Sequence, residues 1–178
     1  MALTKSAVVD TALGLLHEAG LPGMSMRTLA TRLNVQPSAL YWHFPSKQAL
    51  LTAVAERVLA DVAPVEAGAS AADELRGVTR ALRAAVAGVP DGAEIVALGL
   101  AAGAVNPVVD AVARTGARHG GGDRAAGLTT ALTAYVLGVT IEEQTHHNLA
   151  AVDPAMPRVD YDSRFNEGLE ALLAGLGG

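Results

Sequence analysis

The segment of residues 29–44 constrains the fold of this chain more than any other. It is typical of a helix, a sharp turn at Asn34 and a second short helix that begins at Pro37. Asparagine tolerates positive φ, and proline fits the first turn of a helix, so two helices can cross closely here. Half of the six aromatic residues in the chain lie in this segment, namely Tyr41, Trp42 and Phe44. This clustering among polar residues predicts a contact surface, and our first hypothesis is contact with DNA.

Capping signals predict three helices in residues 1–51. Thr4 and Ser25 are suited to N-caps, and Gly20 is suited to end a helix because glycine adopts the left-handed conformation. The expected helices are Lys5–Ala19, Met26–Leu33 and Pro37–His43. Three short helices with a tight second turn predict a helix-turn-helix, whose last helix enters the major groove of DNA.

The remainder of the chain predicts an all-α body. Apolar residues make up 51% of the sequence, much of it alanine and leucine, which favour helices. The expected helices cover residues 47–63, 73–86, 94–104, 108–118, 123–149 and 163–176. We place the domain boundary inside the first of these, near Thr52. The prediction is a helix-turn-helix domain over residues 1–51 and a ligand-binding and dimerisation domain over residues 52–178.

Charge and composition exclude several classes of protein. Four basic and two acidic residues give residues 1–51 a charge of +2, so the rest carries −7 of the total of −5. One copy should therefore bind DNA weakly, and two copies acting together are expected. The longest apolar run, Ile95–Val105, is shorter than the ~20 residues of a membrane-spanning helix. Without a secretory signal either, the protein is expected to be cytoplasmic with no membrane partner.

Enzyme motifs are missing from the sequence. It contains no glycine-rich phosphate loop, no Gly-x-Ser-x-Gly and no His-Glu-x-x-His, so we predict that the chain is not an enzyme. It also contains no cysteine, which excludes disulfides and Cys-ligated zinc. Two Glu/His pairs at i, i+4 spacing have metal-ligand chemistry, but two ligands do not make a closed site. These pairs are Glu142 with His146 and Glu143 with His147. We predict no metal and no cofactor.

Several short motifs resemble the TetR family of bacterial repressors, and within it the tetracycline-repressor class. The dense part of the resemblance comprises Leu29-Ala30, Leu33, Leu40-Tyr41-Trp42-His43 and Lys47-Gln48-Ala49-Leu50-Leu51. A sparser part continues through Asp91-Gly92-Ala93, Leu98-Gly99, Leu137-Gly138, Glu142 to Gln144 and Phe165 to Glu170. The resemblance implies a homodimer on a palindromic operator in double-stranded DNA. It also implies a small-molecule inducer, and dimerisation through the 123–149 helix and the last helix.

The resemblance assigns roles to residues of the helix-turn-helix. Arg27 is placed where a base contact is made, and arginine bidentate to guanine is the commonest specific pairing. Tyr41 and Lys47 are expected at phosphates, which position the protein without reading sequence. Trp42 has the alternative of filling the core. The predicted DNA-binding residues are Arg27, Thr28, Gln36, Pro37, Ser38, Ala39, Tyr41, Trp42, His43 and Lys47.

The predicted ligand pocket departs from the tetracycline-repressor pattern. The positions of four polar drug or metal contacts hold Ala63, Val78, Ala97 and Leu100, whereas a glutamate remains at Glu142. A polar ligand would leave groups unpaired there, at about 1–3 kcal/mol each. We therefore predict an inducer that is more apolar than tetracycline. The predicted pocket residues are Val78, Leu82, Ala97, Leu100, Val112, Leu137, Ile141 and Glu142.

Two alternatives to this function remain at the level of sequence. One is a DNA-binding regulator controlled by a protein partner, because the apolar run Ile95–Val105 fits a packed core as well as a pocket. The other is a sensor of tetracycline-type drugs.

Overall fold

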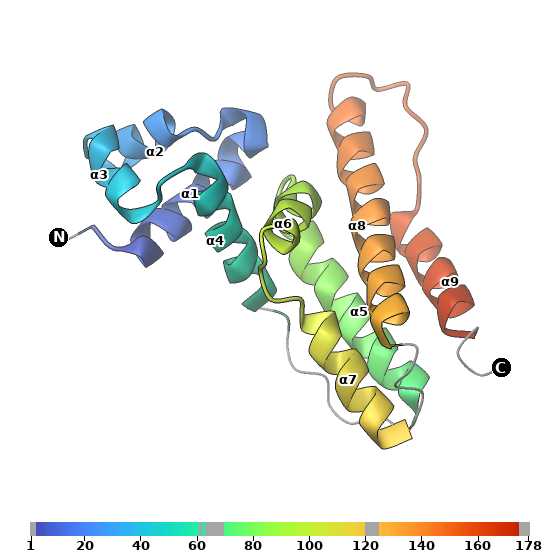
Figure 1. The fold of residues 1–178 in the computed structure, drawn as a ribbon. Coiled ribbons are helices and arrows are strands. Elements are labelled where there is room, and N and C mark those ends of the chain that lie inside the picture. Colours follow the sequence, from blue (N-terminus) through green and yellow to red (C-terminus); the bar gives the residue numbers. More distant parts are fainter. Residues whose placement is uncertain (1–2, 61, 63–69, 120–124, 175–178) are drawn as a thin grey trace.

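The protein is built from helices packed as a small head and a larger body (Figure 1). The computed structural model describes residues 3–60, 62, 70–119 and 125–174, and these contain no strand. We call the first three helices the head: α1 (Lys5–Gly23), α2 (Met26–Leu33) and α3 (Pro37–His43). After the link α4 (Lys47–Ala60), the body comprises α5 (Ala71–Ala87), α6 (Gly92–Ala101), α7 (Pro107–His119), α8 (Ala125–Ala150) and α9 (Tyr161–Ala174). The all-α prediction is confirmed.

No single helix of the described residues is long and apolar enough to cross a membrane. The pair α5 and α6 passes that test together by length and composition, but the two helices bend by 114° at the break between them.

Local capping defines the helices of the head where the sequence predicts them. Thr4 Oγ1 accepts a hydrogen bond from the amide of Ala7 at 3.2 Å, and Ser25 Oγ accepts one from Thr28 at 3.0 Å. Each bond satisfies an amide that has no partner inside its helix. Gly20 has a φ of 62° and interrupts α1, although one further helical turn follows where a plain turn was expected.

The turn between α2 and α3 depends on Asn34, whose φ of 52° lies in the left-handed region. Its amide donates to the carbonyl oxygens of α2, so the chain reverses within a few residues. Leu40 then enters the head core and is fully buried together with Leu29. Leu33 and Ala39 are only partly buried.

The link helix α4 is apolar on more than one face. Its buried residues include Leu50, Leu51, Val54, Val58 and Leu59. α4 contacts α1 of the head and α6 of the body. Gly99 permits a very close approach of α6, because a Cβ at that position would lie 2.3 Å from the Cβ of Ala55. A displacement of α6 must therefore move α4 as well.

The almost wholly apolar sequence of residues 94–104 predicts a helix that is buried on all sides, and this prediction is wrong in part. α6 packs against α4, α5 and α8, and these neighbours cover only one side of it. The covered side carries Ile95, Val96 and Gly99, whereas Ala97, Leu98 and Leu100 are partly exposed. Composition alone cannot distinguish a buried helix from one whose second apolar side is left open.

α9 begins at Tyr161 instead of the predicted Ser163. The Oδ1 atom of Asp160 accepts a hydrogen bond from the amide of Ser163 at 2.9 Å, so the aspartate is the cap. Three apolar residues of α9 are buried, namely Phe165, Leu169 and Leu173, but Leu172 is 37% exposed. Ala63, the start of the helix predicted over residues 123–149 and the end of the helix predicted over residues 163–176 lie outside the described residues.

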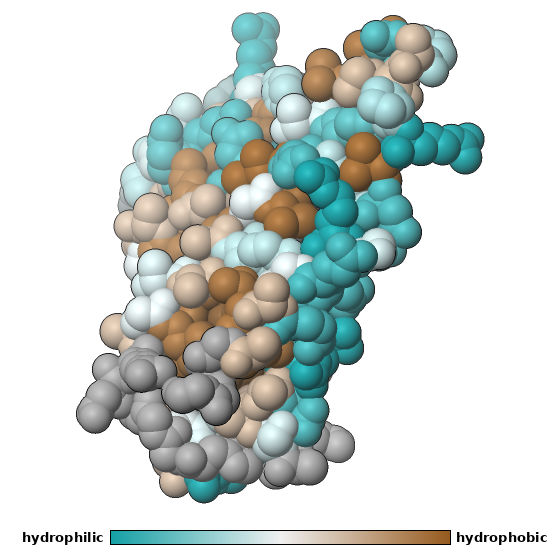
Figure 2. All heavy atoms as spheres, turned by 90° about the vertical axis from the view of Figure 1, so that its right-hand side faces the viewer, coloured by the Kyte–Doolittle hydropathy of each residue, from teal (hydrophilic) through white to brown (hydrophobic). Residues whose placement is uncertain are grey.

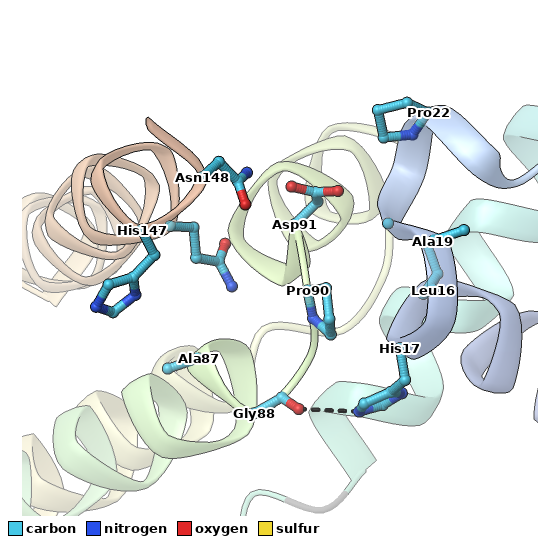
Figure 3. A pocket seen from close by; sticks show the side chains of 12 residues that line it. Leu16, His17, Ala19, Pro22, Ala87, Gly88, Pro90, Asp91, His147 and Asn148 are labelled. Carbon is cyan, nitrogen blue, oxygen red and sulfur yellow. Dashed lines mark hydrogen bonds between the residues drawn. The ribbon is translucent and has the colours of Figure 1, made fainter. Parts of the chain in front are cut away.

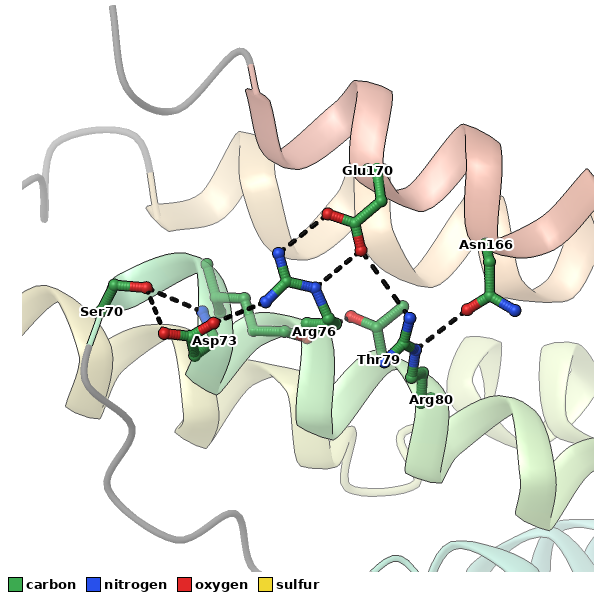
Figure 4. A network of polar contacts seen from close by, with 8 residues as sticks. Ser70, Asp73, Arg76, Thr79, Arg80, Asn166 and Glu170 are labelled. Carbon is green, nitrogen blue, oxygen red and sulfur yellow. Dashed lines mark hydrogen bonds and ion pairs between the residues drawn. The ribbon is translucent and has the colours of Figure 1, made fainter. Parts of the chain in front are cut away.

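A ladder of polar contacts joins α5 to α9 (Figure 4). Arg76 Nε donates to Glu170 Oε1 at 2.7 Å, and Arg80 Nε donates to the amide oxygen of Asn166 at 3.0 Å. Arg83 Nη1 donates to a carboxylate oxygen of Asp162 at 2.6 Å. The three arginines lie on the side of α5 opposite its apolar stripe. That side is therefore covered by the last helix.

Candidate functional site

α3 exposes most of its residues and buries one. Leu40 is fully buried, whereas the neighbouring Tyr41 and Trp42 are 50% and 90% exposed. The exposure of Trp42 contradicts the alternative in which this ring fills the core. Gln36, Pro37 and Ser38, at the N-terminal end of α3, are exposed as well. α3 is thus anchored by Leu40 and directs its first turn and its aromatic rings to solvent.

The first turn of α2 meets the first turn of α3 at a shallow hollow of about 540 Å³. Arg27 of α2 lines this hollow together with Gln36, Pro37 and Tyr41. The structure therefore brings together four of the ten residues predicted to contact DNA. Thr28 lies beside them and is also exposed, with its hydroxyl 2.7 Å from that of the capping Ser25.

Sequence reasoning missed Thr31, which lines the same hollow. Its hydroxyl donates to the carbonyl oxygen of Arg27 at 3.1 Å. Thr31 lies one helical turn after Arg27, so the i, i+4 spacing could have identified it.

Three of the other predicted contacts are less accessible than these. Ala39, His43 and Lys47 are each partly buried. Lys47 is the first residue of α4, and Ser46 before it accepts a hydrogen bond from the amide of Ala49 at 3.1 Å. Amides at a helix N-terminus favour negative charge, so Lys47 lies where a phosphate would be attracted.

One of the four basic residues of the head region is already paired. Both guanidinium Nη atoms of Arg32 donate to the carboxylate of Glu18 on α1. The hydrogen bonds from Arg32 hold the pKa of Glu18 below its ordinary value. Arg32 therefore contributes less to the DNA-facing charge than the sequence count of +2 implies.

The eight predicted pocket residues are distributed over four helices of the body. Val78, Leu82 and Val112 are buried in the body core, and Ala97, Leu100 and Leu137 are partly buried. Ile141 and Glu142 on α8 are exposed, and Glu142 accepts a hydrogen bond from Arg164 of α9 at 2.8 Å. The pocket that these residues would form stays a prediction.

The two Glu/His pairs of α8 are engaged with other partners. Glu143 Oε2 accepts a hydrogen bond from Arg83 at 2.9 Å, as Glu142 does from Arg164. The Nε2 atom of His146 lies 2.9 Å from the carbonyl oxygen of Pro157. Among the described residues, no three His, Cys, Asp or Glu side chains are grouped so that they could hold a metal ion.

Taken together, the anchored α3, the tight turn at Asn34 and the exposed first turns of α2 and α3 define a helix-turn-helix DNA-binding protein with a separate helical body. Residues 8–54 match the family of bacterial regulatory proteins described as the tetR family. The tetracycline repressor protein class A from transposon 1721 of Escherichia coli is 34% identical to this chain over an alignment of 198 positions. The alignment covers 98% of this chain and 90% of that protein. The chain therefore belongs to the TetR family, whose members are regulators of transcription and not enzymes.

Two solved structures extend the likeness to the whole molecule. The crystal structure of BioQ with its double-stranded DNA operator has a TM-score of 0.82 and 31% identity, with 98% of each chain covered. A TetR variant from Acinetobacter baumannii AYE in complex with minocycline also has a TM-score of 0.82, with 32% identity and coverage of 99% of this chain and 97% of that one.

Proposed function

We propose that this chain is a transcriptional repressor that binds a palindromic operator as a homodimer and leaves it when a small molecule binds the body. The observation that carries the proposal is the single exposed surface on which Arg27, Gln36, Pro37 and Tyr41 meet. This surface combines Arg27, whose side chain can bind a guanine base, with residues at the start of the recognition helix. In helix-turn-helix proteins these N-terminal residues face the base edges. The operator complex of BioQ and the minocycline complex of the TetR variant support the two halves of this cycle.

The dimer is proposed to form through α8 and α9. Ile141 on α8 and Leu172 on α9 are large apolar residues that are 43% and 37% exposed. Figure 2 faces the side of the molecule that carries α9 and shows apolar side chains gathered beside a polar margin. Burial of such a surface against a second copy would bring two heads together. Two heads are needed because the low charge of a single head predicts weak binding to DNA.

Release of DNA is proposed to pass through α4. α4 packs on α1 and on α6, and Gly99 and Ala55 leave no space between α4 and α6. A ligand that wedges against α6 would displace α4 and change the separation of the two recognition helices from the ~34–36 Å of one DNA turn. This works only if the ligand binds the displaced state more tightly than the DNA-binding state.

The inducer is proposed to be rather apolar. Val78 and Leu82 in the buried wall of α5 offer no hydrogen bond from their side chains, and Ala97 of α6 offers none either. The sensor of tetracycline-type drugs is the second candidate, favoured by the 34% identity to a tetracycline repressor. A titration of the operator complex with magnesium and tetracycline separates the two. We expect no release of DNA, and release at drug concentrations in the micromolar range would establish the second candidate instead.

We place the DNA-binding unit at residues 1–51 and the ligand-binding and dimerisation unit at residues 52–178. Because a bacterial operator lies on DNA in the cytoplasm, we infer that the regulator works there.

Selection of bound fragments from random double-stranded DNA tests the DNA-binding proposal. We expect an inverted repeat with half-sites about 10–10.5 base pairs apart, or a multiple of that spacing. On the selected site, Arg27→Ala should lose about 1–3 kcal/mol of discrimination at one base position. Lys47→Ala should weaken all sequences alike and reduce the slope of affinity against salt by about one unit.

Arg114→Ala is the matched control, because it removes the same charge from an exposed position on α7 of the body. Its affinity and salt slope should equal those of the wild type. If Arg27→Ala and Lys47→Ala also behaved as the wild type does, the assignment of this surface to DNA would be wrong.

A further inference from the structure

A cavity of about 690 Å³ lies at the joint between the head and the body (Figure 3). Its walls come from α1, from the turn between α5 and α6, and from the C-terminal part of α8. None of the eight predicted pocket residues lines it. The volume falls within the roughly 300–1,000 Å³ of small-molecule sites in proteins. We call it the joint cavity.

The head and the body touch beside this cavity through two polar contacts. The amide of Leu21 donates to Asp91 Oδ2 at 2.6 Å, and His17 Nε2 lies 3.2 Å from the carbonyl oxygen of Gly88. Gly20 brings the chain close to the aspartate, because a Cβ there would lie 2.9 Å from the same Oδ2 atom. Beside the cavity, α1 thus meets the turn between α5 and α6 through these two polar contacts.

The lining of the joint cavity combines apolar walls with one carboxylate and the polar side chains of His17, Gln144, His147 and Asn148. Leu16, Pro22 and Pro90 supply apolar surface, and Asp91 is the only acidic residue among the described lining residues. These contain no lysine and no arginine. Only one of the two carboxylate oxygens of Asp91 has a hydrogen-bond partner within the described part of the chain. On the α8 wall, the side-chain amide of Asn148 forms no hydrogen bond with any described residue.

We propose that the joint cavity is a second small-molecule site, separate from the ligand pocket predicted in the body, and that it takes an organic ammonium compound with an apolar frame. The free carboxylate oxygen of Asp91 binds the ammonium group in a charge-assisted hydrogen bond. The apolar walls take the frame, and Asn148 offers a further polar contact.

Such a ligand would act as a brace between head and body. It touches α1 on one side and both the α5–α6 turn and α8 on the other, so it binds best when these elements keep the arrangement that forms the cavity. Binding to one arrangement only shifts the population towards it. The effect on operator affinity rests on the proposed function, whereas binding of the ammonium compound does not.

The test uses the full-length protein, with 2-phenylethylammonium as the probe and 2-phenylethanol as its uncharged analogue. Binding is followed without DNA by the backbone amide shifts of Leu21, Gly88 and Gly92. We expect the ammonium compound to bind at least fivefold more tightly than the alcohol. Asp91→Asn, which keeps an oxygen for the amide of Leu21, should abolish that preference.

Two further variants separate occupancy of the cavity from general destabilisation. Ala87→Leu fills the cavity from an exposed lining position and should weaken both compounds at least fivefold. Ala113→Leu makes the same change at an exposed position on α7 and should alter neither affinity. Equal binding of the two compounds, or shifts centred on Val78 and Val112 instead of the joint, would overturn the site.

A second measurement tests the brace. With the probe at saturation, the affinity for the selected operator should change by threefold or more, and Ala87→Leu should remove that change. Unchanged operator affinity in a protein that binds the probe would overturn the brace. A protein that binds the probe but no DNA at all would instead contradict the proposed function.

Discussion

Replacing Gly99 by alanine tests whether the tight contact between α6 and α4 connects the body to the head. The added Cβ would lie 2.3 Å from the Cβ of Ala55, whereas ordinary contact begins at 3.4 Å. Both residues are buried and lie on helix backbones, so neither side chain can rotate away. The two helices must separate by about 1 Å at this point, because close-packed interiors have no spare volume.

The expected loss of stability follows from two opposing effects. Overpacking of a helix interface costs about 1–3 kcal/mol. An alanine in place of a helical glycine contributes about 1 kcal/mol in the other direction. We expect Gly99→Ala to lower the free energy of unfolding by up to about 2 kcal/mol. Operator affinity should also fall, because α4 leads directly into the head.

Gly14→Ala is the matched control, since a Cβ at Gly14 in α1 meets nothing within 4 Å. It should raise the free energy of unfolding by up to about 1 kcal/mol. Urea denaturation at one fixed protein concentration measures all variants, because a dimer's stability depends on concentration. Adding Ala55→Gly to Gly99→Ala should restore operator binding. If Gly99→Ala stabilised the protein as much as Gly14→Ala does, the reasoning about this contact would be refuted.

Three further predictions concern the head and the last helix. Leu40→Ala should cost about 2–5 kcal/mol and abolish operator binding, because Leu40 is the buried residue of α3; retained binding would contradict this. Arg76 lowers the pKa of Glu170 by hydrogen bonding, so this stabilisation is present above the ordinary carboxylate pKa and is lost as pH falls through the lowered value. Thermal denaturation of Glu170→Gln should therefore differ from wild type near neutral pH and converge with it in acid; a constant difference would argue against the ion pair. Gly168→Ala should loosen α9 and weaken dimerisation in sedimentation, since its Cβ would lie 2.1 Å from Tyr135 Oη; an unchanged dimer would place the interface elsewhere.

The head could be predicted closely from the sequence because its signals are local. Thr4, Ser25 and Ser46 cap helices through bonds to amides three residues away. Asn34 makes its turn by its own φ angle. Features of this kind depend on the neighbouring residues and not on distant partners, so each was placed correctly.

The body was harder to predict because its contacts join distant parts of the chain. The sequence placed Arg76, Arg80 and Arg83 on one side of α5, but their partners on α9 lie 79 to 94 residues away. At the start of α9, Asp160 and Ser163 are both suitable caps, and only the folded chain selects between them.

The joint cavity had no sequence signal at all. It forms only when residues 16–22, 87–91 and 144–148 meet. The predicted ligand pocket is also hard to locate from the sequence, because Ile141 and Glu142 are exposed in a single protomer.

The exposed ring on α3 also has a spectroscopic consequence. Trp42 is the only tryptophan of the chain and is 90% exposed. Its indole emission therefore comes entirely from the recognition helix, with no background from the body. Quenching or a blue shift on adding operator reports contact at that helix. If a body ligand changed this emission in the absence of DNA, its binding would alter the surroundings of the recognition helix. The effect of the body on the head could then be measured without any added label.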